Sequence, residues 1–186
     1  GMLAEIKPNG TDKVRAYSID LKDYVEFGLN EEDAPRASWA RYIFGVCREM
    51  IKRGVDVKGF NTAFSGDVPL GAGMSSSAAL ESTYAFALNE LFGEGKIDKF
   101  ELAKVGQATE HNYCGVNCGI MDQFASGLPF TGISVFPIPS GRLSPGIDGF
   151  SSETRTGFFC LQQASSELRS CCCCYPEKTS ARRIPA

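Results

Sequence analysis

Two glycines and three serines lie in one short segment of this chain, between an expected strand and an expected helix. Gly71 and Gly73 let a ligand approach the backbone closely, because glycine has no Cβ and adopts conformations barred to other residues. Ser75, Ser76 and Ser77 offer hydroxyls where the first N–H groups of the helix lack partners and the helix dipole is positive. Such a segment can bind a phosphate group.

The candidate nucleotide-binding residues of this loop are Pro69, Gly71, Ala72, Gly73, Met74, Ser75, Ser76, Ser77 and Ala78. On the G-x-G spacing alone, an ordinary serine-capped helix after a glycine turn is the favoured interpretation. The loop is not a Walker A motif, because no Gly-Lys-Ser/Thr follows it.

A second segment carries carboxylates at a suitable distance downstream. It reads QATEH over residues 107–111 and GVNCGIMDQF over residues 115–124, with Glu110 and Asp122 as its acidic residues. Together, the two segments resemble the phosphate-binding and catalytic motifs of the GHMP kinase family, in the form found in galactokinases. The resemblance covers about residues 2–126.

The resemblance implies an ATP-dependent sugar kinase with galactose as the second small-molecule substrate. The loop from Gly71 to Ser77 would wrap the ATP phosphates, and Ser77 and Glu110 would bind Mg²⁺. Hard cations prefer such oxygen ligands. Asp122 would be the catalytic residue that orients the sugar's anomeric hydroxyl, since phosphoryl transfer needs mainly positioning and charge neutralisation.

Each of these residues also has a purely structural interpretation. Ser77 could cap a helix, Glu110 could be a solvated carboxylate at a helix end, and Asp122 could be an N-cap. We expect His111 to have a structural role rather than a catalytic one.

The hydrophobic pattern predicts the elements that position these residues. Short alternating segments predict strands over residues 2–8, 13–20, 23–29 and 58–66. An amphipathic helix is predicted from an N-cap Ser38 to Gly54, with one apolar face formed by Trp39, Ile43, Val46, Cys47 and Ile51. Further helices are predicted from the serine loop to about Phe92, over about residues 99–112, and from about Gly119.

These elements agree with the fold that the resemblance implies. This fold is α+β, a sheet covered by helices, namely the GHMP-kinase N-terminal domain (ribosomal protein S5 domain 2-like), truncated and with a left-handed crossover. We expect residues 1–126 to form this partial ATP-binding domain.

Composition excludes several other classes of protein. The chain has 186 residues with a formal net charge of −3 and no long run of one sign, which argues against a nucleic-acid surface. No apolar stretch is long enough to span a bilayer, and no signal peptide is evident. We therefore expect a cytoplasmic protein without nucleic-acid or membrane partners, and nothing in the sequence indicates an oligomeric state.

The eight cysteines fit neither a disulfide framework nor a zinc site. Cys114 and Cys118 have a tolerable spacing for metal, but the chain has one histidine, His111, and no second cysteine pair. Buried free thiols are the expected state of these two residues. The run Cys171 to Cys174 lies in the C-terminal segment.

Residues 127–186 differ in character and predict a poorly structured tail translated out of frame. When codons permitted for Val135 to Pro185 are read one nucleotide later, they allow a stop-free sequence containing KHELASSAYNKRRQSCE, which resembles the next segment of galactokinases. A shifted frame would lose the binary pattern of a designed core.

The motifs present leave three functions open. The Gly-Arg and Gly-Glu-His-Thr-Asp-Tyr runs that recognise the sugar in the family do not occur among these residues, so we expect an inactive galactokinase fragment. The alternatives are another GHMP sugar kinase, such as an N-acetylgalactosamine kinase-like enzyme, and a non-catalytic sugar or nucleotide sensor.

Overall fold

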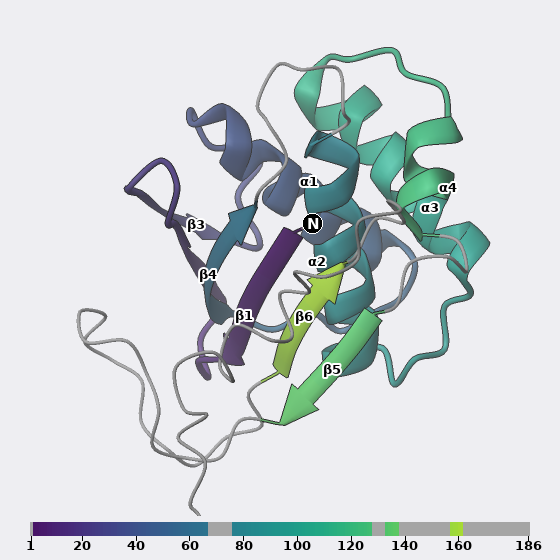
Figure 1. Ribbon diagram of the computed structural model, residues 1–186. Helices are drawn as coiled ribbons and strands as arrows, with labels where there is room; N and C mark the ends of the chain where they lie inside the picture. The colour runs from purple at the N-terminus through teal and green to yellow at the C-terminus, as the bar shows by residue number, and fades with distance from the viewer. Residues whose placement is uncertain (1, 67–75, 128–132, 138–156, 162–186) are drawn as a thin grey trace, which may run out of the picture.

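The computed structural model describes residues 2–66, 76–127, 133–137 and 157–161. Within these ranges the chain forms a six-stranded sheet with its helices gathered on one side (Figure 1). The strands are β1 (Met2–Pro8), β2 (Lys13–Ser18), β3 (Asp23–Gly28), β4 (Phe60–Gly66), β5 (Ile133–Pro137) and β6 (Gly157–Leu161). The helices are α1 (Ser38–Lys52), α2 (Ser76–Phe92), α3 (Lys99–Thr109), the π-helix η1 (Glu110–Cys114) and α4 (Met121–Gly127).

The sheet has the strand order β3-β2-β4-β1-β6-β5. β2 and β4 are parallel, and every other neighbouring pair is antiparallel. The alternation in β1 buries Ala4 and Ile6, and the alternation in β4 buries Phe60 and Phe64. Since successive side chains of a strand point to opposite faces, these residues form the face that the helices cover.

The four predicted N-terminal strands are confirmed, β1 with its predicted bounds and the other three with shorter ends. β2 stops at Ser18 because the chain turns before β3, with Lys22 in the left-handed region at φ 52°. The helix predicted from residue 38 is also confirmed, but its cap is not Ser38. Ala37 is the N-cap and makes no side-chain hydrogen bond, while Ser38 is already helical.

The apolar face of α1 was predicted correctly except at its last turn. Trp39, Ile43, Val46 and Cys47 are buried, but Ile51 is 37% exposed. Met50 is fully buried in its place. The predicted face was therefore rotated by one residue at the C-terminal end of the helix.

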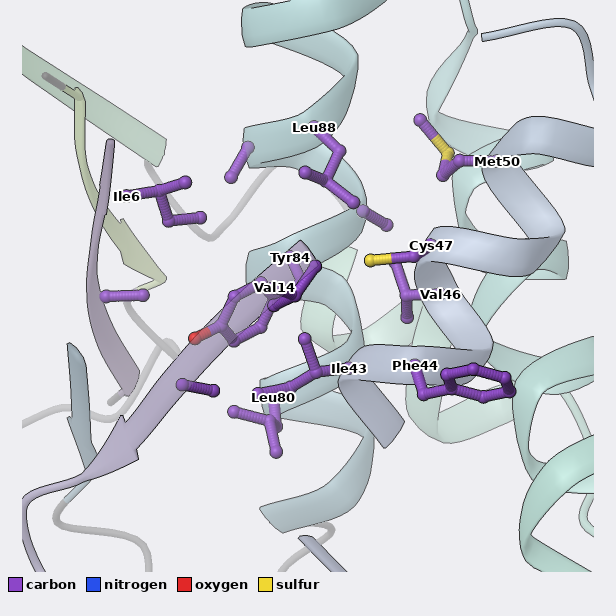
Figure 2. Close-up of a cluster of buried hydrophobic side chains, with 14 of the residues drawn as sticks. Ile6, Val14, Ile43, Phe44, Val46, Cys47, Met50, Leu80, Tyr84 and Leu88 are labelled. Carbon is purple, nitrogen blue, oxygen red and sulfur yellow. The ribbon is translucent and has the colours of Figure 1, made fainter. Parts of the chain in front are cut away.

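Helix α2 lies at the centre of the helical layer. It packs on the sheet and also against α1, α3 and α4, and twelve consecutive residues from Ala78 to Asn89 are buried. A helix that is buried on all sides has no single apolar face, in contrast to the amphipathic α1. In Figure 2, Leu80, Tyr84 and Leu88 of this helix lie between Ile6 of the sheet and the side chains of α1.

Two strands of the sheet come from the segment that was expected to be a tail. β6 pairs with β1, and β5 pairs with β6. Without them β1 would be an edge strand, whose unpaired N–H and C=O groups are available for pairing with another strand whatever its origin. The pairing therefore has no bearing on the reading frame, and the frameshift remains a prediction. In the described part of the chain, no helix is long and apolar enough to cross a membrane.

Candidate active site

The two sequence motifs meet where α2 begins and α3 ends. The Ser77 hydroxyl donates a hydrogen bond of 2.8 Å to Oε1 of Glu110, a residue far along the sequence. Ser77 is the second residue of α2, so its side chain is used in this contact rather than as the helix cap. Two of the three residues that the resemblance assigned to metal and catalysis are therefore in direct contact.

The loop before α2 is only partly described. Ser76, Ser77 and Ala78 form the first turn of the helix, with both serines half-buried. Pro69, Gly71, Ala72, Gly73, Met74 and Ser75 lie outside the described residues. The first turn of α2 contains no acidic residue, so the positive end of the helix dipole is not neutralised from within the helix.

Glu110 lies at a change of helical geometry. It is the C-cap of α3 and the first residue of the π-helix η1. Gly115 ends this segment in the left-handed conformation at φ 70°, and the Val116 N–H donates to the Glu110 carbonyl. Short π-helices often occur at functional sites. The carboxylate is buried, with 5% exposure, so the alternative of a solvated carboxylate at a helix end is wrong.

Asp122 is in the first turn of α4, after the exposed Met121. Because Met121 is already helical, Asp122 is not the N-cap of this helix. Its side chain is half-buried. α4 packs against both α2 and α3, so the helix that carries Asp122 adjoins the helices that carry the other two residues.

Sequence reasoning missed a buried carboxyl in the same region. Glu81 of α2 is fully buried, and its Oε2 accepts a 3.2 Å hydrogen bond from Nε2 of Gln123. Burial raises the pKa of Glu81 to about 9, the negative charge of Glu110 adds to the rise, and the Gln123 hydrogen bond opposes it. The available signal was an acidic residue among apolar and small residues, one turn after Ser77.

The loop before α4 is held by polar contacts to one carbonyl. The Cys118 carbonyl accepts from Nε2 of Gln107 at 3.3 Å and lies 3.0 Å from Nε2 of His111. His111 is exposed and holds this loop, which agrees with the structural role expected for it.

The cysteines of this region are free thiols. Cys114 and Cys118 are half-buried rather than fully buried as expected, because η1 and the following loop lie at the surface. Burial and the nearby glutamates raise the pKa of Cys114 to about 12 and that of Cys118 to about 11. Both thiols are therefore protonated at neutral pH and poor metal ligands. No group of three His, Cys, Asp or Glu residues in the described ranges could hold a metal ion.

Comparisons with known proteins agree with the motifs. The family described as "GHMP kinases N terminal domain" matches residues 41–129. The galactokinase of Bacillus subtilis is 47% identical over 132 residues, which are 69% of this chain and 34% of that protein. The galactokinase of Clostridium tetani is 39% identical over 131 residues, which are 69% of this chain and 33% of that protein.

A solved structure confirms the fold. The crystal structure of Lactococcus lactis galactokinase complexed with galactose matches with a TM-score of 0.65 and 31% identity, covering 73% of this chain and 36% of that one. The chain thus spans about a third of the length of the relatives it matches. The predicted α+β fold is confirmed: this chain carries a GHMP kinase N-terminal domain, truncated relative to galactokinases.

Proposed function

We propose that this domain binds ATP with Mg²⁺ at the N-terminal end of α2, as the nucleotide-binding part of a galactokinase. The observation that carries the proposal is the 2.8 Å contact between Ser77 Oγ and Glu110 Oε1, which joins the two motifs. The galactokinases of Bacillus subtilis and Clostridium tetani support the assignment of the reaction class.

The residues present fit a magnesium ion. Mg²⁺ binds through oxygen atoms and usually takes one or two protein ligands, with waters and phosphate oxygens at its other positions. Ser77 and Glu110 supply two oxygens side by side, one of them a buried carboxylate. The ion would neutralise charge on the transferring phosphoryl group.

The residues of the chain have separable roles in this proposal. The backbone N–H groups and hydroxyls of the loop from Gly71 to Ser77 hold the ATP phosphates, helped by the dipole of α2. Asp122 orients the anomeric hydroxyl of galactose and accepts its proton, or stabilises it electrostatically, as the hydroxyl attacks the γ-phosphate. Each role is one of positioning and charge, as phosphoryl transfer requires.

The test of this function is a calorimetric titration of the chain with ATP, with and without Mg²⁺. We expect Mg²⁺-dependent binding that Ser77→Ala weakens. Thr83→Val is the matched control, because it also deletes a hydroxyl from α2, and within the described residues that hydroxyl donates to the Ala79 carbonyl of the same helix. Equal losses for the two variants, or no binding of ATP at all, would contradict the proposal.

The same protein can be assayed for ADP formation with galactose and with N-acetylgalactosamine. We expect no turnover by this chain with either sugar, because the sugar-recognition runs are not among its residues. Turnover with N-acetylgalactosamine alone would favour the alternative of an N-acetylgalactosamine kinase-like enzyme. Tight ATP binding without turnover in a chain that carries the sugar-recognition runs would favour a sensor.

The out-of-frame origin of residues 127–186 is a separate proposal. Re-sequencing the encoding DNA from upstream of Gly1, through the codons of Ser126 to Val135 and past Ala186, tests it directly. We expect codons that yield a galactokinase-like sequence when read one nucleotide later. Codons that yield no such sequence would refute the shift.

A further inference from the structure

Three helices meet at one buried cluster beneath the candidate active site. Its members are Glu81 of α2, Gly106 of α3 and Gln123 of α4. Glu81 Oε2 accepts the 3.2 Å hydrogen bond from Gln123, and neither side chain is more than 1% exposed. A Cβ on Gly106 would lie 2.8 Å from Cγ of Gln123 and 3.1 Å from Oε2 of Glu81. The three helices are therefore in contact here with no spare volume.

Each member of this cluster adjoins one residue of the candidate site along its own helix. Glu81 follows Ser77 by one turn of α2, and Glu110 follows Gly106 by one turn at the end of α3. Gln123 follows Asp122 directly on α4. A displacement of one helix at the cluster would therefore move one site residue relative to the other two.

The cluster is polar although burying polar groups in the core lowers the stability of the protein. Oε1 of Glu81 and Oε1 of Gln123 have no hydrogen-bond partner among the described residues. A buried polar atom without a partner is destabilising, whereas two apolar side chains of the same shape would not carry that cost. The polar pair constrains the geometry between α2 and α4, because a hydrogen bond fixes the relative placement of two helices more narrowly than apolar packing does.

We propose that the Glu81–Gly106–Gln123 cluster is a positioning unit that sets the mutual placement of Ser77, Glu110 and Asp122. The inference rests on the proposed function of these three residues. In this account the cluster touches neither nucleotide nor metal and acts only through the helices. Groups that orient metal ligands in this way commonly change metal affinity by about 10- to 100-fold when they are replaced.

The test compares variants of the cluster with a polar contact at the other end of α2. Glu81→Leu removes the acceptor of the Gln123 hydrogen bond, Glu81→Gln keeps an acceptor oxygen, and Gly106→Ala pushes the helices apart. Asn89→Ala is the control, since the Asn89 side chain bonds both the N–H and the carbonyl of Ile97 and is also buried. The dissociation constant of ATP in the presence of Mg²⁺ is measured for each variant, together with its free energy of unfolding.

We expect Glu81→Leu and Gly106→Ala to weaken binding of ATP with Mg²⁺ by about tenfold. Glu81→Gln should recover most of the loss seen in Glu81→Leu. Asn89→Ala should change the affinity by less than about twofold, even if it lowers the free energy of unfolding as much as Glu81→Leu does. An equal loss of affinity in Asn89→Ala and Glu81→Leu would show that the cluster affects binding only through general core packing, and would overturn the proposal.

A second measurement separates this proposal from the proposed function. The backbone amide resonances of Ser77, Glu110 and Asp122 report their placement without any ligand. They should shift together in Gly106→Ala and stay in place in Asn89→Ala. If the unmodified chain binds no ATP, the proposed function fails and these resonances decide: coordinated shifts would support the positioning unit, and unmoved resonances would refute it.

Discussion

Replacement of Glu81 by glutamine should stabilise the protein, and the gain should grow with pH. Glutamine has nearly the shape of glutamate and keeps an oxygen that can accept from Gln123, so the buried contact is preserved. What it removes is the ionisable group. In the native protein, burial raises the pKa of this carboxyl from 4.5 to about 9.

The sign and size of the effect follow from proton linkage. The folded state keeps a proton on Glu81 that the unfolded chain releases above its ordinary pKa, so stability is lost as the pH rises from 4.5 toward 9. One unit of pKa corresponds to about 1.4 kcal/mol. The carboxyl therefore lowers the free energy of unfolding by about 1 kcal/mol near pH 5 and by about 3 kcal/mol near pH 7.

Urea unfolding at a series of pH values measures this directly. The advantage of Glu81→Gln over the native chain should increase by about 2 kcal/mol between about pH 5 and about pH 7. Glu90→Gln, at an exposed position of the same helix, corrects for exchanging glutamate for glutamine in α2. An advantage that stays constant with pH, or a loss of stability at neutral pH, would refute the account of a buried, protonated carboxyl.

Three further substitutions test the packing and the helix ends, each by the change in free energy of unfolding in urea. Gly45→Ala should destabilise by about 1 to 3 kcal/mol, because its Cβ would lie 2.5 Å from Cγ2 of Thr109; an unchanged midpoint would contradict the close approach of α1 to α3. Tyr84→Phe should cost about 1 kcal/mol, since it deletes the buried 2.7 Å hydrogen bond with Thr62, and a stabilised variant would show that bond to be absent. Asp98→Ala should cost about 1 kcal/mol by removing the side chain that caps two N–H groups of α3, and no loss would mean that the cap does not form in solution.

Local patterns were sufficient for most of the fold. The period of two in β1 and the period of 3.6 in α1 are set by which face is buried, so the elements could be predicted without the tertiary structure. The ends of elements depend on contacts that the local sequence does not contain. Ser38 has a good capping side chain, yet the chain enters the helix one residue earlier, at Ala37.

The candidate site was predictable in part for the same reason. Ser77 and Glu110 were found because each belongs to a recognisable motif, and the structure brings them into contact. Gln123 stands inside the second motif and Glu81 follows the first, but both gain their roles only from the packing of α2 against α4. A buried carboxyl is recognised by its surroundings, and those surroundings come from three separate helices.

The central claim is that Ser77 and Glu110 together bind the magnesium ion that accompanies ATP. The most direct measurement is the dissociation constant of ATP for the native chain and for Glu110→Gln, each titrated with Mg²⁺ and with a chelator in its place. We predict a loss of about tenfold or more in Glu110→Gln when Mg²⁺ is present, and almost no change with the chelator. The same loss under both conditions would contradict the claim, because Glu110 would then act on the nucleotide or the fold and not on the metal.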